Sequence, residues 1–361
     1  MKIALVHDYF KEIGGAERVL MALCEMYPDA PVYTAYKFPE FWGEFKINKV
    51  IESWGRFLPC LPKFISYYTL LSPLFFVSFD LSDYDLVIVS QTGGYFPNGV
   101  KVGPQTKLIT YCHTPPRFLY GYPTATKERE KWYWKPISEI VNHILRMVDF
   151  QFAQKPNLFL ANSKNVAERI KKFYRRDSIV VYPPVSIPHP QPLSLLQERG
   201  DYYLVVSRIV GSKGLELLLP LGKKYNIKIA GRPIGKGGQQ IINNLQKNNI
   251  EYLGEVGEEQ KWKLMGQAKA FLCLSKDEDF GITSVEAQAC GTPVLAYNGG
   301  GYRETVVPGK TGVLFDEYST NGIIRGIEEI GEINWDSEVI KKHARKFSKE
   351  NFVKQCQNYL K

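Results

Sequence analysis

The sequence has no apolar stretch close to the roughly 18 residues that a membrane-spanning helix needs. Its six cysteines are scattered and form no C-x-x-C pair, so neither a disulfide framework nor a thiolate metal site is indicated. Several of them lie inside apolar runs, which favours buried free thiols in a reducing compartment. The first residues form a strand pattern that soon reaches His7 and Asp8, unlike a signal peptide. We therefore expect a cytoplasmic protein.

Several catalytic signatures are also missing. There is no G-x-x-x-x-G-K-[ST] phosphate loop, no G-x-S-x-G nucleophile elbow and no Cys/His spacing typical of a metal site. Two D-x-D matches, Asp83–Asp85 and Asp277–Asp279, could hold a divalent metal on a diphosphate, but so short a motif often arises by chance. These absences disfavour P-loop phosphoryl transfer and serine hydrolysis.

Acidic residues are too few to balance the basic ones. The chain has 46 Lys and Arg against 37 Asp and Glu, a formal charge of +9. Such an excess favours an anionic partner, which could be nucleic acid, acidic lipid or a phosphorylated metabolite. The densest basic run, Arg169–Arg176, is equally well explained as a solvated helix face. A basic, non-enzymatic anion-binding protein would rest on this charge alone, and we expect no nucleic-acid partner.

Short apolar runs alternate with helical patterns along the whole chain, which predicts α/β domains with parallel sheets. Helices are expected after Gly14-Gly15, over 16–27, and after Asn162-Ser163, over 167–173. The expected strands are 3–6, 32–33, 86–90, 108–111, 158–161 and 179–181 in the first half, and 203–207, 227–230, 251–253, 271–274, 294–296 and 313–315 in the second.

Four prolines in residues 182–190 mark the best candidate for an interdomain linker. We therefore expect two doubly wound, Rossmann-like domains, 1–184 and 185–336, followed by an amphipathic helix over 337–361. Ligands of such open sheets bind at the carboxyl ends of the strands, so a cleft between the two domains is expected.

An aromatic segment, 53–79, interrupts this alternation of strands and helices. It carries Trp54, Phe57, Phe75 and Phe76 together with basic residues such as Arg56. One interpretation is a helical pair buried inside the first domain, which we favour. The other is a lipid-interface segment, with basic groups near the headgroups and aromatic rings below them.

The most informative segment is E-D-F-G-I-T-S-V-E, which runs from Glu278 to Glu286 between an apolar strand and a helix. This order places Glu278 on a loop above the sheet and Glu286 about one turn into the helix. Both carboxylates could therefore face one ligand at the helix N-terminus. They offer hydrogen bonds to hydroxyls, and the helix N-terminus offers a seat for an anion.

Cations and glycines follow the neighbouring strands. Arg208 and Lys213 lie on a glycine-containing loop, from which both could converge on a diphosphate. Gly231 and Arg232 form a turn after the next strand, and Val256 follows a third strand where backbone groups could read a base edge. Each signal can also be explained as ordinary βα-turn chemistry.

The first domain carries weaker signals. Gly14 and Gly15 between a strand and a helix allow a phosphate or sugar to approach closely, although a full G-x-G-x-x-G is lacking. His113 follows an apolar strand, a position that faces the expected cleft more often than the core. His7 and Asp8 end the first strand in the same way, with turn capping and function equally weighted.

Together these motifs resemble the retaining glycosyltransferases of family 4, which have the GT-B fold. The similar pieces are G-G-A-E at 14–17, S-R-I-V-G-S-K-G at 207–214, Y-L-G-E-V at 252–256, E-D-F-G-I-T-S-V-E-A-Q-A-C-G-T-P-V at 278–294 and G-G-G-Y-R-E-T-V at 299–306. With C-H-T-P-P-R at 112–117, the chain looks most like bacterial mannosyltransferases that extend polysaccharide or O-antigen repeats.

The resemblance implies roles for the residues singled out above. Arg208 and Lys213 would hold the donor diphosphate, and Glu286 would bind the ribose hydroxyls. Glu278 would orient the donor sugar, with backbone N–H groups of Asp279, Phe280, Gly281 and Ile282. His113 would contact the sugar or a nearby acceptor atom, Gly14 and Gly15 would border the diphosphate, and the last helix would cross back onto the first domain.

The resemblance further implies a metal-independent hexosyltransferase without a cofactor, in which a nucleotide-diphosphate sugar donates to a glycan or lipid-linked acceptor in cell-surface polysaccharide synthesis. GDP-mannose is the leading donor, and a UDP-hexose is the alternative. A sugar-nucleotide epimerase of the same fold is less favoured. Contact with the inner face of the cell membrane would be peripheral.

Overall fold

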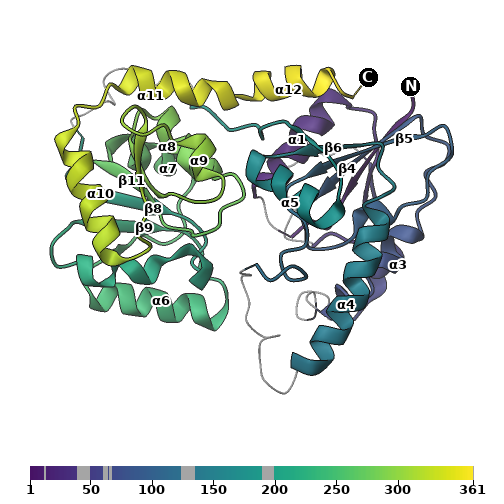
Figure 1. The fold of residues 1–361 in the computed structure, drawn as a ribbon, viewed down its shortest axis with the longest axis horizontal. Helices are drawn as coiled ribbons and strands as arrows, with labels where there is room; N and C mark the ends of the chain where they lie inside the picture. The colour runs from purple at the N-terminus through teal and green to yellow at the C-terminus, as the bar shows by residue number, and fades with distance from the viewer. Residues whose placement is uncertain are drawn as a thin grey trace. The chain divides into compact units, whose positions relative to one another are not determined.

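The computed structural model describes residues 1–11, 14–38, 49–59, 64, 67–122, 135–188 and 199–360. The chain divides into two compact units: residues 1–184 together with 349–361, and residues 185–348. Each unit contains one parallel sheet flanked by helices (Figure 1). The expected class, two Rossmann-like α/β domains, is confirmed.

The sheet of the first unit has seven strands in the order β3-β2-β1-β4-β5-β6-β7. Its strands are β1 (Ile3–His7), β2 (Val32–Thr34), β3 (Val50–Glu52), β4 (Leu86–Gln91), β5 (Lys107–Cys112), β6 (Leu158–Ala161) and β7 (Ile179–Val180). The helices of this unit are α1 (Gly15–Met26), α3 (Ser72–Val77), α4 (Lys135–Phe152), α5 (Lys164–Tyr174) and α12 (Lys349–Gln357), with short 3-10 turns at Trp54–Phe57 and Pro97–Gly99.

Strand alternation divides the core of this unit between the two faces of the sheet. Leu5 packs with α1 and α12, whereas its neighbours Ala4 and Val6 pack with Phe75 and Phe76 of α3. All five side chains are almost fully buried. Because both faces are covered, the strands read as continuous apolar runs, which is why the sequence located them.

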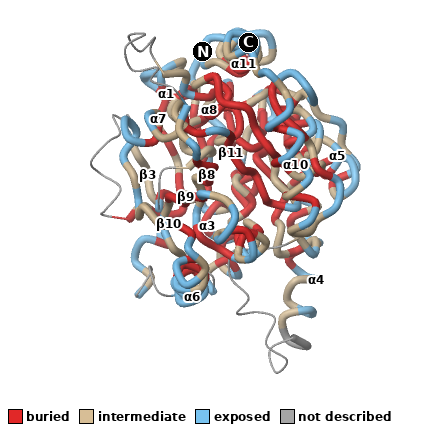
Figure 2. Tube along the Cα trace, turned by 90° about the vertical axis from the view of Figure 1, so that its left-hand side faces the viewer, coloured by how far each residue is buried: buried red, intermediate tan, exposed pale blue. Residues whose placement is uncertain are grey.

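The sheet of the second unit has six strands in the order β10-β9-β8-β11-β12-β13. They are β8 (Tyr203–Val206), β9 (Ile227–Ala230), β10 (Glu251–Tyr252), β11 (Ala270–Cys273), β12 (Val294–Tyr297) and β13 (Gly312–Phe315). The helices are α6 (Gly235–Lys247), α7 (Glu258–Gln267), α8 (Ile282–Ala289), α9 (Tyr302–Thr305), α10 (Thr320–Glu332) and α11 (Ser337–Ala344), with 3-10 turns at Gly211–Lys213, Leu215–Leu221 and Arg345–Phe347. Figure 2 shows the central strands β8 and β11 buried.

The C-terminal region differs from the single helix expected over 337–361. It forms two helices, separated by the 3-10 turn Arg345–Phe347 and the extended residue Ser348, and they belong to different units. α11 stays with the second unit, where His343 Nδ1 lies 2.9 Å from Oε1 of Gln288 on α8. α12 packs on α1 of the first unit through Phe352 and Cys356.

The aromatic segment is buried in one part and exposed in another. Phe75 and Phe76 are fully buried in the core of the first unit, as the favoured interpretation requires. Trp54 and Phe57, in contrast, are 40% and 75% exposed, and the guanidinium of Arg56 lies over the Phe57 ring. Residues 60–63 and 65–66 of this segment lie outside the described residues.

Candidate functional site

The loops after β8, β9, β10 and β11 carry most of the candidate residues, and they emerge at one edge of the second sheet. The four strands are parallel neighbours, so their carboxyl ends point the same way. This edge is where ligands of open α/β sheets bind.

Lys213 and Glu278 meet at this edge although they are 65 positions apart in the sequence. Lys213 Nζ donates to Glu278 Oε2 at 2.6 Å, and the hydroxyl of Tyr302 donates to the same oxygen at 3.3 Å. The two charged side chains are 22% and 21% exposed, so a ligand can reach them. Burial and the nearby Glu278 carboxylate raise the pKa of the Tyr302 hydroxyl far above its usual value, which keeps that hydroxyl a donor.

Helix α8 begins beside this pair. Its N-cap, Gly281, has φ +90°, and a Cβ there would lie 2.7 Å from the Tyr302 ring, so both the backbone and the space require glycine. The first-turn N–H groups of a helix have no partner within the helix and carry partial positive charge. The start of α8 therefore offers hydrogen-bond donors next to Glu278.

Glu286 lies in the second turn of α8 and is only 2% exposed. Lys261 Nζ donates to its Oε1 at 3.1 Å and also contacts both carboxylate oxygens of Glu258 at 2.9 Å. Lys261 thus compensates the buried charge of Glu286, which would otherwise be costly to bury. The sequence did not single out Lys261, because a lysine three positions after a glutamate in a charged helix is typical of a solvated face.

The turns after β8 and β9 fit tightly against each other. Gly231 has φ +140°, and a Cβ there would lie 1.8 Å from the carbonyl oxygen of Ser207. The backbone N–H of Ile209 donates to the carbonyl of Arg232 at 2.9 Å. The side chains of Arg208 and Arg232 are exposed along this edge, and Val256 is half-buried after β10.

In the first unit, Gly14 caps α1, and Gly15 is the first residue of that helix. The N–H of Gly14 donates to Oε2 of Glu17 at 2.8 Å, the contact that the third helical residue makes in a capping box. This contact fixes the glycine turn between β1 and α1 and involves a carboxylate that the sequence reasoning had not used.

His113 follows β5 directly and is 8% exposed. Its Nε2 lies 3.0 Å from Oγ of Ser90, and its carbonyl accepts from Asn162 Nδ2 at 3.0 Å. Burial lowers the pKa of the His113 imidazole to about 3, with a smaller contribution from His7. The ring is therefore neutral at physiological pH and carries one proton.

Asp8 serves the fold by fixing a loop. It is fully buried and accepts hydrogen bonds from the N–H groups of Thr92, Gly94 and Tyr95 and from the Thr92 hydroxyl. Burial raises the pKa of the Asp8 carboxyl, and His7 together with the donors of Thr92 and Tyr95 opposes the shift. Turn capping and function were equally weighted for His7 and Asp8. For Asp8, the structure shows hydrogen bonds that hold the loop after β4.

Two sequence-family models together match most of the chain. The model described as Glycosyltransferase Family 4 matches residues 13–187, and the one described as Glycosyl transferases group 1 matches residues 191–347. The chain belongs to the family 4 glycosyltransferases. It is thus a glycosyltransferase of the GT-B type, as the motifs predicted.

Relatives of this glycosyltransferase are distant in sequence. An uncharacterized glycosyltransferase of Methanocaldococcus jannaschii is 28% identical over 201 residues, which is 54% of this chain and 55% of that protein. The mouse alpha-1,3/1,6-mannosyltransferase ALG2 is 24% identical over 349 residues, 84% of this chain and 81% of the mouse protein.

Solved structures share the fold. The Anabaena protein Alr3699/HepE in complex with UDP and glucose superposes with a TM-score of 0.68 at 18% identity, over 100% of this chain and 99% of that one. Sucrose-phosphate synthase from Thermosynechococcus elongatus gives a TM-score of 0.71 at 16% identity, over 99% and 98%. Both are similar to this glycosyltransferase over its whole length.

The structure brings some of the predicted site residues of this glycosyltransferase together. Lys213, Glu278 and the start of α8 form one cluster in the second unit, with Tyr302 as an addition that the sequence had not indicated. Gly14, Gly15 and His113 belong to the first unit. The catalytic and donor-binding roles expected for these residues stay predictions.

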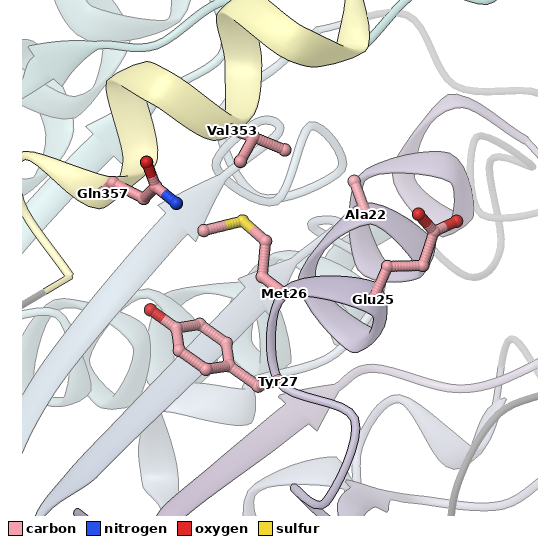
Figure 3. A pocket seen from close by; sticks show the side chains of 6 residues that line it. All are labelled: Ala22, Glu25, Met26, Tyr27, Val353 and Gln357. Atoms are coloured by element: carbon pink, nitrogen blue, oxygen red, sulfur yellow. The ribbon is translucent and has the colours of Figure 1, made fainter.

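A surface hollow of the first unit carries none of the predicted site residues. This hollow of about 260 Å³ between α1 and α12 is lined by Ala22, Glu25, Met26, Tyr27, Val353 and Gln357 (Figure 3). Among the helices that the structure describes, none is long and apolar enough to cross a membrane.

Proposed function

We propose that this glycosyltransferase transfers a hexose from a nucleotide-diphosphate donor to a hydroxyl of a glycan or lipid-linked glycan in cell-surface polysaccharide synthesis, with retention of anomeric configuration and without a metal. The Lys213–Glu278 pair beside the start of α8 is the observation that carries the proposal. It combines a cation, a carboxylate and helix N–H donors within one ligand's reach.

Lys213 is suited to the diphosphate because its ammonium has three N–H donors. One of them is used on Glu278, so the others can reach a phosphate oxygen without breaking the pair. Arg208, exposed on the same loop, would supply the second cation. Helix N–H groups of α8 and the glycine turn at Gly231 would complete the donor seat.

The two glutamates would bind hydroxyls. Glu278, held by Lys213 and Tyr302, would accept from hydroxyls of the donor sugar, and Glu286 would accept from the ribose. A carboxylate can accept several hydrogen bonds at once, so contacts with lysine leave capacity for a sugar hydroxyl. In these roles the glutamates orient the donor and do not exchange protons with it.

In the reaction, the bond between the anomeric carbon and the diphosphate oxygen breaks, and a bond from that carbon to the acceptor hydroxyl forms on the same face. The acceptor proton passes to the departing diphosphate, so no protein side chain has to act as nucleophile or base. Negative charge grows on the leaving group, where fixed cations stabilise the transition state most.

Mannose from GDP-mannose is the leading donor, supported by the name of the mouse relative, a mannosyltransferase. UDP-glucose or another UDP-hexose is the alternative, supported by the UDP and glucose named for the Anabaena structure. Peripheral membrane contact would bring the enzyme to a lipid-linked acceptor, and the exposed Trp54 and Phe57 beside Arg56 suit it.

A donor panel tests the proposal. GDP-mannose, GDP-glucose, UDP-glucose and UDP-galactose are compared by thermal shift and then by hydrolysis, with the free nucleotides as controls. We expect one nucleotide diphosphate sugar to raise the Tm and to be consumed. An epimerase would convert the donor to another nucleotide sugar with no acceptor present, and that product would refute transfer.

A further inference from the structure

Four side chains of the first unit form a chain of contacts that ends at His113. Glu17 on α1 has Oε1 3.6 Å from Nε2 of His7, at the end of β1. His7 Nδ1 lies 3.1 Å from Oγ of Ser90 in β4, and Ser90 Oγ lies 3.0 Å from Nε2 of His113 after β5. The chain follows from the sheet, because β1, β4 and β5 are neighbours and His7 and Ser90 are register partners.

These contacts are shielded from solvent. His7 and Ser90 are fully buried, and Glu17 is 13% exposed. Nε2 of His7 forms no hydrogen bond with the described residues, and the Glu17 carboxylate faces it at 3.6 Å. The two contacts of Ser90 Oγ are of hydrogen-bond length, so the protons of His7, Ser90 and His113 have to be mutually consistent. The position of one proton therefore fixes the positions of the others.

Glu17 sets the direction of the chain. Its Oε2 accepts from the N–H of Gly14, and its Oε1 faces Nε2 of His7. A carboxylate oxygen only accepts, so a lone pair on Nε2 would be repelled, whereas an N–H there is attracted. A His7 ring that carries a single proton therefore holds it at Nε2 and accepts at Nδ1.

The rest of the chain follows from this choice. The Ser90 hydroxyl donates its proton to Nδ1 of His7, so its oxygen accepts from Nε2–H of His113. Because His113 is neutral, its Nδ1 then carries a lone pair. Nδ1 of His113 has no hydrogen-bond partner among the described residues.

We propose that Glu17, His7 and Ser90 are positioning residues that hold His113 as its Nε2–H tautomer, so that Nδ1 accepts a hydrogen bond from a substrate hydroxyl. The hydroxyl belongs to the donor sugar or the acceptor, and this part of the inference rests on the proposed function. The opposite tautomer would present an N–H to the substrate, so it could not accept a hydrogen bond from a substrate hydroxyl.

Glu17→Gln tests the direction of the chain. The Gly14 N–H needs an acceptor, so the carboxamide oxygen replaces Oε2 there and the NH₂ group faces Nε2 of His7. An NH₂ donor requires a lone pair on Nε2, which reverses every proton in the chain and leaves His113 protonated at Nδ1. Glu25→Gln on the same helix is the matched control, since Glu25 pairs at the surface with Lys349.

The readout is the ¹⁵N spectrum of protein labelled at its five histidines, recorded without substrate. The His113 signals are identified by comparison with a His113→Gln variant. We expect a protonated-type shift at Nε2 in the wild type and in Glu25→Gln, and at Nδ1 in Glu17→Gln. A wild-type His113 protonated at Nδ1, or one unchanged in Glu17→Gln, overturns the inference.

Turnover provides a second readout. Glu17→Gln should lower kcat/KM about tenfold, the usual consequence of losing one well-oriented hydrogen bond, while thermal unfolding stays close to that of Glu25→Gln. If the His113 tautomer reverses in Glu17→Gln but kcat/KM stays unchanged, the proposed hydrogen bond between His113 and the substrate is overturned. The ¹⁵N result needs no nucleotide sugar, so failure of the proposed donor chemistry is distinguishable from failure of the chain.

Discussion

Lys213→Ala separates the catalytic role proposed for Lys213 from a structural one. The lysine and its partner Glu278 are each about one-fifth exposed, so their contact at 2.6 Å is partly screened by water. Pairs in this setting contribute about 1 kcal/mol to stability, at the upper end of the range for exposed ion pairs. Loss of a cation that stabilises a leaving group costs about 3 kcal/mol of activation free energy, or two orders of magnitude in rate.

The assay combines urea unfolding with turnover at saturating donor. We expect Lys213→Ala to lose about 1 kcal/mol of stability and about 100-fold in kcat. Lys224→Ala is the control, because Lys224 forms a more exposed ion pair with Glu328 in the same unit and should change neither quantity much. Full turnover of Lys213→Ala would refute the phosphate role, and a stability loss near 4 kcal/mol would show that the lysine mainly supports the fold.

Three further predictions follow from the described contacts. Gly281→Ala should lower the free energy of unfolding in urea by about 2 kcal/mol, because φ +90° disfavours a side chain and the new Cβ would meet the Tyr302 ring. Unchanged stability would contradict this geometry. Burial raises the pKa of the Asp149 carboxyl to about 7. The free energy of unfolding should therefore fall as the pH rises from about 4 to 7, by at most about 4 kcal/mol. Asp149→Asn should flatten this part of the pH–stability curve. Glu286→Gln should cost about 2 kcal/mol of stability, because Lys261 then keeps Glu258 as its one carboxylate partner among the described residues. The same change should raise the donor KM, and an unaltered KM would contradict the ribose role.

The strands could be predicted because strands covered on both faces read as unbroken apolar runs. β3 was missed, because Val50–Glu52 contains only two apolar residues and all three of its residues are half-buried. The start of α5 was also predicted too late: the helix begins at Lys164, and Ser163 is its N-cap, accepting from the N–H of Val166. Short edge strands and first helical turns lack the periodicity on which such predictions depend.

The sequence indicated the charged residues of the site but not their pairing. Lys213 and Glu278 each followed a predicted strand, yet nothing local shows that these side chains meet. Lys261 and Tyr302 escaped notice because only the folded chain brings them to the two glutamates. The contact between Glu17 and His7 is of the same kind, since it depends on where α1 lies against the sheet.

The central claim, glycosyl transfer from a nucleotide diphosphate sugar, is tested most directly by ¹H NMR of donor hydrolysis. With no acceptor present, water can take the place of the acceptor hydroxyl, and the spectrum resolves both the nucleotide and the first-formed anomer of the sugar. We expect a nucleoside diphosphate and a free hexose whose first anomer has the configuration of the donor. Release of a nucleoside monophosphate with hexose 1-phosphate, or a first-formed anomer of opposite configuration, would contradict it.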